Sequence, residues 1–194
     1  SSDLTTGTID AFGASALGAN TTGTGNAAFA IFALQANTTG VSNTAMGRAS
    51  LAGNTTGNCN TALGDAALNA NTTASNNTAV GYQAGYSNTT ATNNVFIGYS
   101  AGLNYNNLNT SVFADTFIGS FAGNSTTTAT DSTFVGSRAG YANTTGSKNT
   151  VLGAGALYSN TTASQNTAVG YQAGYTNAIG TQVTYIGYQA GYTA

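Results

Sequence analysis

Apolar residues recur along the chain at a fixed interval of 17 residues. The recurring unit is an apolar residue followed by glycine and, three residues later, usually alanine. The spacing is 17 residues throughout except for one interval of 21. The glycines that mark the units are Gly13, Gly47, Gly64, Gly81, Gly98, Gly119, Gly136, Gly153, Gly170 and Gly187, with Ala30 in the second place. The chain therefore holds eleven copies of one unit, and we expect a single repeat domain over residues 1–194 whose coils begin at about residue 9.

Each repeat is numbered from the residue four places before its glycine, so that the glycine stands at position 5. Position 4 is apolar in every copy, and position 8 is Ala in all but one, where Ser50 replaces it. We expect both positions to face inward and to form columns of buried side chains. Position 9 is either Leu or Gly, and Tyr usually follows the Gly at position 10. These two combinations suggest two ways of filling the same space.

The polar and apolar residues around position 4 alternate with a period of two, as in residues 78–82 (Thr-Ala-Val-Gly-Tyr). This alternation is typical of a β-strand. Glycine opposes a helix by about 1 kcal/mol per residue, and the Asn-Thr-Thr segment that follows favours a turn. We therefore predict an all-β fold, a parallel β-solenoid (β-roll) of eleven 17-residue coils, each with two short strands and two turns.

One coil is longer than the others. The interval between Gly98 and Gly119 contains four extra residues, which lie within residues 104–114. Insertions in a solenoid form loops on one face. We expect the coil to bulge outward there without breaking the strand pairing on either side, and we regard the insertion as a candidate contact loop.

The composition excludes several classes of function. Only 4% of the residues are charged, with three Lys and Arg, no His and no Glu. So few cations give no electrostatic basis for nucleic-acid binding, and no apolar run approaches the ~18 residues of a membrane span. The five Asp residues occupy different repeat positions, so no catalytic constellation or metal site is expected. The sequence predicts a protein that is not an enzyme and needs no cofactor.

Two repeat positions are candidates for contact with other molecules. Tyrosines at position 6 either stack to stabilise the sheet or form a flat platform for sugar rings; they are Tyr82, Tyr99, Tyr171 and Tyr188. Asn-Thr-Thr recurs at position 12 and is formally a glycosylation acceptor, or else a turn with stacked Asn and Thr. These asparagines are Asn20, Asn37, Asn54, Asn71, Asn88, Asn143 and Asn160.

The string Asn-Thr-Ala-Val-Gly-Tyr-Gln-Ala-Gly-Tyr occurs at 77–86 and again at 166–175. It resembles the repeats of trimeric autotransporter adhesin heads and, more closely, the Gly-Tyr-Gln-Ala-Gly repeats of phage tail fibres and related bacterial surface fibres. The resemblance extends from about Ile9 to Tyr192, although adhesin heads commonly have a shorter period. It implies a parallel β-roll assembled as a homotrimer, on an extracellular, cell-surface or virion fibre that mediates host attachment.

The coils carry few large apolar side chains, so we expect further burial between chains. Neither end has a polar capping repeat, and exposed strand edges are templates for more strands, so we expect either that the ends join neighbouring chains or that the chain is a fragment. The expected partner is therefore the chain itself, as a homotrimer or a head-to-tail filament, with a cell-surface glycan as a further candidate. The first hypothesis is an adhesive fibre segment, and the second is a self-stacking extracellular filament subunit. The third is an ice-binding solenoid, although adjacent threonines on opposite faces leave a single Thr column on each.

Overall fold

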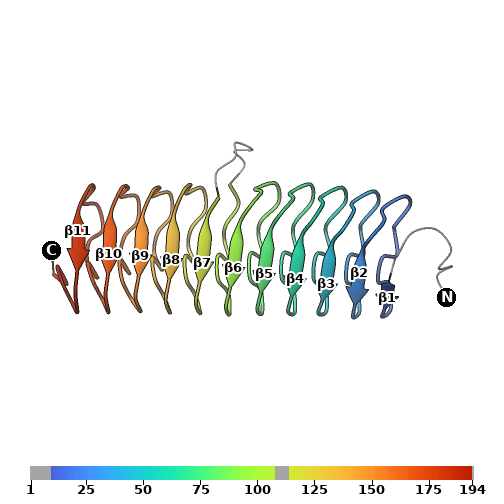
Figure 1. The fold of residues 1–194 in the computed structure, drawn as a ribbon, viewed down its shortest axis with the longest axis horizontal. Coiled ribbons are helices and arrows are strands. Elements are labelled where there is room, and N and C mark those ends of the chain that lie inside the picture. Colours follow the sequence, from blue (N-terminus) through green and yellow to red (C-terminus); the bar gives the residue numbers. More distant parts are fainter. Residues whose placement is uncertain (1–9, 108–113, 194) are drawn as a thin grey trace.

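The computed structural model describes residues 10–107 and 114–193, which form one rod-shaped parallel β-solenoid (Figure 1). Eleven three-residue strands form one sheet in chain order. The strands are β1 (Asp10–Phe12), β2 (Ala27–Phe29), β3 (Thr44–Met46), β4 (Thr61–Leu63), β5 (Thr78–Val80), β6 (Val95–Ile97), β7 (Thr116–Ile118), β8 (Thr133–Val135), β9 (Thr150–Leu152), β10 (Thr167–Val169) and β11 (Thr184–Ile186). The predicted all-β, parallel solenoid with a 17-residue period is confirmed.

Each strand pairs with the same repeat positions of the next coil, as Val80 does with Ile97. Hydrogen bonds between coils continue around the other sides of the rod, for example from the N–H of Leu51 to the carbonyl of Ala67 (3.0 Å). The described residues nevertheless contain one strand per coil, so the prediction of two is wrong. Residues with positive φ recur on the remaining sides, such as Asn76 (φ 60°) and Gln83 (φ 53°). These left-handed residues bend the chain too often for a second strand.

The glycine at position 5 allows neighbouring coils to approach each other. Gly81 has a φ of 131°, and a Cβ placed on it would lie 2.6 Å from the carbonyl oxygen of Gly98 in the next coil. A side chain at this place would push the coils apart. This contact explains why the marker residue of the repeat is almost always glycine.

The inward residue of each strand is at position 3, not at position 4. Ala79 and Phe96 are fully buried, whereas Val80 and Ile97 on the same strands are only partly buried. Position 4 of the terminal strands is the most open, with 76% of Phe12 exposed. Because successive side chains of a strand point to opposite faces, the prediction that position 4 faces inward is wrong by one residue. The prediction for position 8 is confirmed in the inner coils, where its side chains are fully buried.

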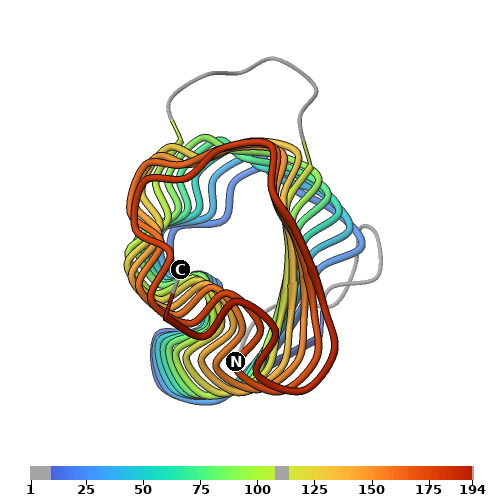
Figure 2. The ribbon, with the colours of Figure 1, turned by 90° about the vertical axis from the view of Figure 1, so that its left-hand side faces the viewer.

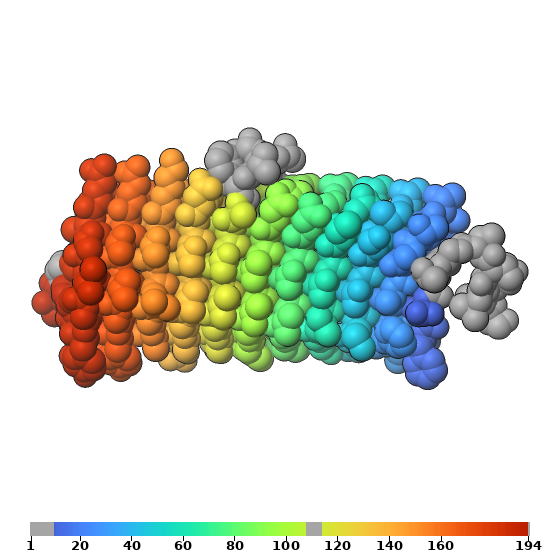
Figure 3. Space-filling model, viewed as in Figure 1, coloured from blue at the N-terminus to red at the C-terminus, as the bar shows by residue number. Residues whose placement is uncertain are grey.

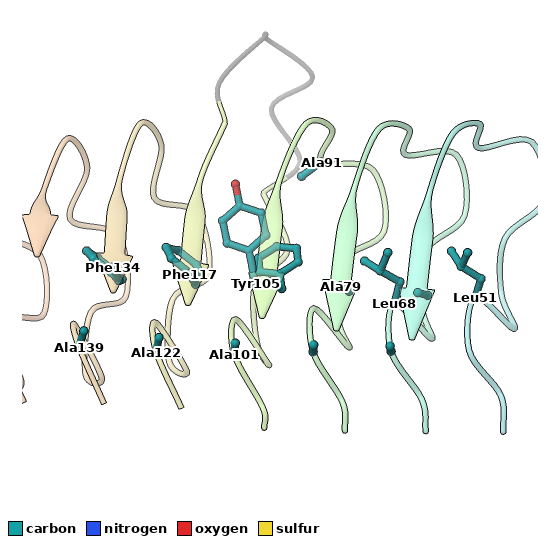
Figure 4. Packing of buried hydrophobic residues seen from close by; sticks show 14 of the residues in the cluster. Leu51, Leu68, Ala79, Ala91, Ala101, Tyr105, Phe117, Ala122, Phe134 and Ala139 are labelled. Atoms are coloured by element: carbon teal, nitrogen blue, oxygen red, sulfur yellow. The ribbon is translucent and has the colours of Figure 1, made fainter. Parts of the chain in front are cut away.

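The interior is filled in two different ways in two stretches of the rod (Figure 4). Coils 2 to 4 combine a small Ala at position 3 with a buried Leu at position 9, as at Leu51 and Leu68. Coils 6 to 8 combine a buried Phe at position 3 with Gly at position 9. A Cβ on Gly140 would lie 2.7 Å from the ring of Phe134. The prediction that Tyr at position 10 fills this space is therefore wrong, because an aromatic ring from position 3 fills it.

The four-residue insertion leaves the sheet intact. On either side of it, β6 and β7 pair in full register, with Val95 opposite Thr116 and Ile97 opposite Ile118. The expectation of an unbroken ladder is confirmed. The predicted outward bulge falls mainly on residues 108–113, which lie outside the described residues.

Candidate binding surfaces

Two columns of side chains cover the outer face of the sheet. Position 2 contributes mostly threonines, and position 4 contributes the apolar residues that we call the outer apolar column. Met46 and Leu152 are more than two-fifths exposed, and the others are exposed or partly buried. The column consists of Phe12, Phe29, Met46, Leu63, Val80, Ile97, Ile118, Val135, Leu152, Val169 and Ile186. It runs along the whole described rod, and continuous apolar surfaces of this kind mark sites of association.

The position-6 tyrosines named as candidate sugar contacts lie on the surface, but they do not form one platform. Tyr82 stacks on Tyr99 with ring centroids 5.2 Å apart, and Tyr171 stacks on Tyr188 at 5.4 Å. All four are at least two-fifths exposed. Small residues separate the two pairs in the intervening coils, namely Ser120, Ser137 and Ala154. The surface therefore offers two short aromatic stacks, each with an outer ring whose face is not covered by another tyrosine of the same column.

A second series of tyrosines was not identified as a contact surface from the sequence. The rings at position 10 of coils 8 to 11 stack with centroids 4.9 to 5.1 Å apart. These residues are Tyr141, Tyr158, Tyr175 and Tyr192, and all are partly buried. The recurrence of Tyr at position 10 was visible in the sequence, but it was interpreted as part of the core. Because the rings lie outside the coil, they add to the aromatic surface.

A depression of about 160 Å³ lies between the two tyrosine series in coils 8 to 10. We call it the tyrosine hollow. It exists because coil 9 has small residues, Ala154 and Gly155, where neighbouring coils have larger ones. Its lining consists of Ser137, Arg138, Ala154, Gly155, Tyr158, Tyr171, Gln172 and Tyr175. Only Tyr171 among these was predicted as a contact residue.

The hollow contains one cation and one oriented amide. The Arg138 guanidinium lies 6.0 Å from the ring centroid of Phe121. Within residues 10–107 and 114–193, the ion pair between Arg48 and Asp65 is the only one, so Arg138 has no carboxylate partner there. Gln172 accepts a hydrogen bond from the Nε2 of Gln189 through its Oε1 (3.0 Å). This bond fixes the orientation of the amide, so the Nε2 of Gln172 can donate a hydrogen bond.

The asparagines of the Asn-Thr-Thr segments point into the solenoid. The Nδ2 of Asn71 donates to the Oδ1 of Asn54 (2.8 Å) and to the carbonyl of Ala74 (3.1 Å). The same side-chain ladder recurs at Asn37, Asn54 and Asn160. Asn20 is partly buried, and the other asparagines of these segments are buried. A glycan on a buried Nδ2 that already donates twice is incompatible with this fold. The ladder favours the alternative of a turn with stacked Asn at the buried positions, whereas Asn20 is only partly buried and its Nδ2 donates to the carbonyl of Gly23.

The threonines that follow these asparagines lie at a bend of each coil, and both positions are exposed or partly exposed in most coils. At position 13 the Thr hydroxyl bonds to the next coil, as from Thr55 to the carbonyl of Thr72 (3.1 Å). At position 14 the side chain is exposed in most coils, as for Thr73.

The residues flanking the insertion form a buried polar pair. The hydroxyl of Tyr105 donates to Asp115 over 2.6 Å, and both side chains are fully buried. Burial raises the pKa of Asp115 to about 6, although the hydrogen bond from Tyr105 acts in the opposite direction. Burial, followed by the charge of Asp115, also raises the pKa of Tyr105. The pair lies inside the coil, so it supports the fold and is not a contact surface.

In the part of the chain that the structure describes, no cluster of three or more potential metal ligands occurs. The same residues include no helix long and apolar enough to span a membrane. Comparison of the chain with protein-family models, curated protein sequences and solved structures finds no match.

Proposed function

We propose that the chain is a segment of an extracellular fibre, of the phage tail-fibre or surface-adhesin type, that attaches to a cell surface. The observation that carries the proposal is the outer apolar column. In this fibre, copies of the chain associate in parallel through that column, and the tyrosine surfaces contact the cell. The resemblance of residues 77–86 and 166–175 to fibre repeats supports the same conclusion.

The period of the column favours a second copy of the chain over an unrelated partner. Its side chains repeat once per coil along the rod, because each coil pairs in register with the next. A parallel copy has the same spacing and can bring an apolar side chain against each of these residues. Burial of each such side chain contributes roughly 1.5–3 kcal/mol when it is complete. Eleven partly exposed positions can therefore stabilise an assembly whose single coils have a thin interior.

Sedimentation equilibrium over a wide concentration range tests the association. We expect a fixed mass of three chains, and the variant Leu152→Lys is expected to shift the distribution toward monomer. The control Thr145→Lys places the same charge on an exposed residue of the preceding coil, away from the column, and should leave the mass unchanged. A mass that grows with concentration, with filaments in electron micrographs, would favour the head-to-tail alternative. A monomer at all concentrations would overturn both forms.

Attachment is tested separately with the fluorescently labelled full chain on a panel of bacterial and animal cells. Saturable binding to at least one cell type is expected. Treatment of those cells with glycosidases should reduce the binding if a glycan is the receptor. An assembled, folded chain that binds no cell in the panel would contradict the adhesive role and leave a purely structural fibre.

A further inference from the structure

We propose that the tyrosine hollow binds a single sugar ring that carries a carboxylate, such as a hexuronic acid, with the carboxylate on Arg138. The inference rests on the proposed attachment function, because it names the class of glycan that one surface of the fibre recognises. The hollow lies over coils 8 to 10, and these coils lie toward the C-terminal end of the rod, in yellow to orange in Figure 3.

One aromatic stack on this surface ends at Tyr171. Tyr188 and Tyr171 stack nearly parallel, with an interplanar angle of 17°. The next residue of the same column is Ala154, which has no ring. The face of Tyr171 toward coil 9 is therefore not covered by a third tyrosine. A flat ring placed there would continue the stack, and the apolar C–H face of a sugar fits the negative face of an aromatic ring.

The polar groups around the uncovered face of Tyr171 can form hydrogen bonds with the hydroxyl groups of a sugar ring. Tyr158 and Tyr175 stack on each other with centroids 4.9 Å apart, so their ring faces are largely occupied. Both tyrosines line the hollow, and a tyrosine hydroxyl can donate to or accept from sugar hydroxyls. The Nε2 of Gln172 is held as a donor by the bond from Gln189. An apolar platform with a few convergent polar groups is typical of a small-molecule site.

The positive charge of Arg138 in the hollow favours a sugar that carries a carboxylate. Arg138 is one of three Lys and Arg residues in a chain of 194 residues. It lies in the lining without a carboxylate partner among the described residues, while Phe121 contacts it from one side. A guanidinium binds a carboxylate through two parallel hydrogen bonds, which are about twice as strong as bonds between neutral groups. A neutral sugar would leave that capacity unused.

The volume of the hollow limits the bound part of the ligand to one sugar ring. A volume of about 160 Å³ is below the roughly 300–1,000 Å³ of pockets that enclose larger ligands. The rest of a glycan chain would extend into solvent. Successive coils are slightly rotated around the axis of the rod (Figure 2).

The test uses two soluble probes, methyl β-glucuronide and methyl β-glucoside, which differ by the carboxylate. Titration of the full-length chain is followed by nuclear magnetic resonance of the tyrosine side chains, and saturation transfer identifies the bound face of the sugar. We expect the glucuronide to bind about tenfold more tightly, a difference of about 1.4 kcal/mol, because only its carboxylate can accept charge-assisted hydrogen bonds from Arg138. Equal binding of the two probes, or binding of neither, would overturn the proposal.

Two variants locate the site. Arg138→Gln should remove the preference for the glucuronide, whereas Lys148→Gln should keep it. The control removes the same charge from an exposed residue at a repeat position where Gln165 and Gln182 already occur. A preference that survives Arg138→Gln would contradict the assigned role of the guanidinium.

Ala154→Tyr should fill the place of the sugar with a ring that other coils already accept at position 6. Both probes should then bind at least tenfold more weakly, while Ala14→Tyr at the far end of the rod should have no effect. Undiminished binding to a folded Ala154→Tyr variant would overturn the proposal. If that variant still attaches to cells, the fibre function stands without this site. If the wild-type chain binds the glucuronide but no cell, the hollow stands and the attachment function fails.

Discussion

The phenolic oxygen of Tyr105 lies 2.6 Å from a carboxylate oxygen of Asp115, and both residues are fully buried at the two ends of the inserted segment. In most other coils, Asn occupies the positions that these residues hold. Asp115 keeps the hydrogen bonds of its repeat position, since its N–H donates to Asn94 and its other carboxylate oxygen accepts from the N–H of Ser132. The pair thus connects the lengthened coil to the position-1 residues of the two neighbouring coils, although a carboxylic acid is buried as a result.

The free energy of unfolding should depend on pH through Asp115. Burial raises the pKa of its carboxyl from 3.8 to about 6, so the folded chain binds the proton more tightly than the unfolded chain does. Stability should therefore be highest below pH 4 and fall as the pH rises from about 4 to 6. It should level off above that range, with a total loss of up to about 3 kcal/mol. Denaturant unfolding at a series of pH values measures this dependence.

The variant Asp115→Asn should remove the pH dependence and raise stability at pH 7, because it installs the neutral residue that most coils have at position 1. Asp10→Asn is the control, since it removes the same charge from an exposed residue on β1, far from Asp115 along the sheet. A pH profile that is unchanged in Asp115→Asn would show that another group is responsible.

The two ways of filling the interior should be interchangeable. Gly140→Leu alone should destabilise the chain by about 1–3 kcal/mol, because the new side chain overlaps the ring of Phe134. Phe134→Ala alone should cost about 3–5 kcal/mol by leaving a cavity. The double variant reproduces the Ala and Leu combination of coils 2 to 4 and should lose less than the sum. Leu already adopts positive φ at this position, for example 49° at Leu51.

A double-mutant cycle on unfolding free energies checks this coupling. Phe134→Ala combined with Ala14→Leu serves as the control, since Ala14 is exposed and remote in the sequence. Additive losses at Phe134 and Gly140 would mean that the two residues do not share one space.

The sequence predicts the repeat, the parallel pairing and the buried Ala at position 8, because all three follow directly from the 17-residue period. It does not decide which of two neighbouring apolar residues faces inward. Ala79 and Val80 are both apolar, and the larger one was expected to be buried. The register of the strand, and not the size of the side chain, decides which residue faces inward, since Ala79 is buried next to Val80 and Phe96 is buried next to Ile97.

The candidate contact surface was predicted only in part. The exposure of Tyr82 and Tyr171 follows from their repeat position. The tyrosine hollow does not follow from repeat position. It depends on the small side chains of coil 9 at Ala154 and Gly155, and on the long side chain of Arg138 from the preceding coil. The inward direction of Asn71 was also missed, since buried amides are uncommon unless a ladder satisfies them.

The Asn ladder should be a main source of stability, and its members should carry no glycan. Asn71→Ala removes two hydrogen bonds donated by its Nδ2 and one accepted from Asn88. Each buried partner left without a bond should cost about 1–3 kcal/mol. Thr73→Ala, which changes an exposed residue of the same coil, should cost little in denaturant unfolding.

Mass spectrometry of the folded chain from a glycosylating host tests whether the ladder asparagines carry a glycan. An unmodified peptide around Asn71 is expected, because a sugar on its Nδ2 would break the ladder. A folded chain with a glycan at Asn71 would contradict the inward direction of this side chain.

The outer apolar column should contribute to stability only through association. Val151 and Leu152 are neighbours on β9, but Val151 is fully buried and 49% of Leu152 is exposed. In an assembly that stabilises the folded state, the melting temperature rises with protein concentration. Leu152→Thr should weaken this dependence and hardly change unfolding at high dilution. Val151→Thr places a hydroxyl in the interior and should destabilise the chain by about 1–3 kcal/mol at every concentration. Thermal unfolding of both variants over a hundredfold range of concentration distinguishes the two effects. A melting temperature of the wild-type chain that does not depend on concentration would indicate that the column has no partner in solution.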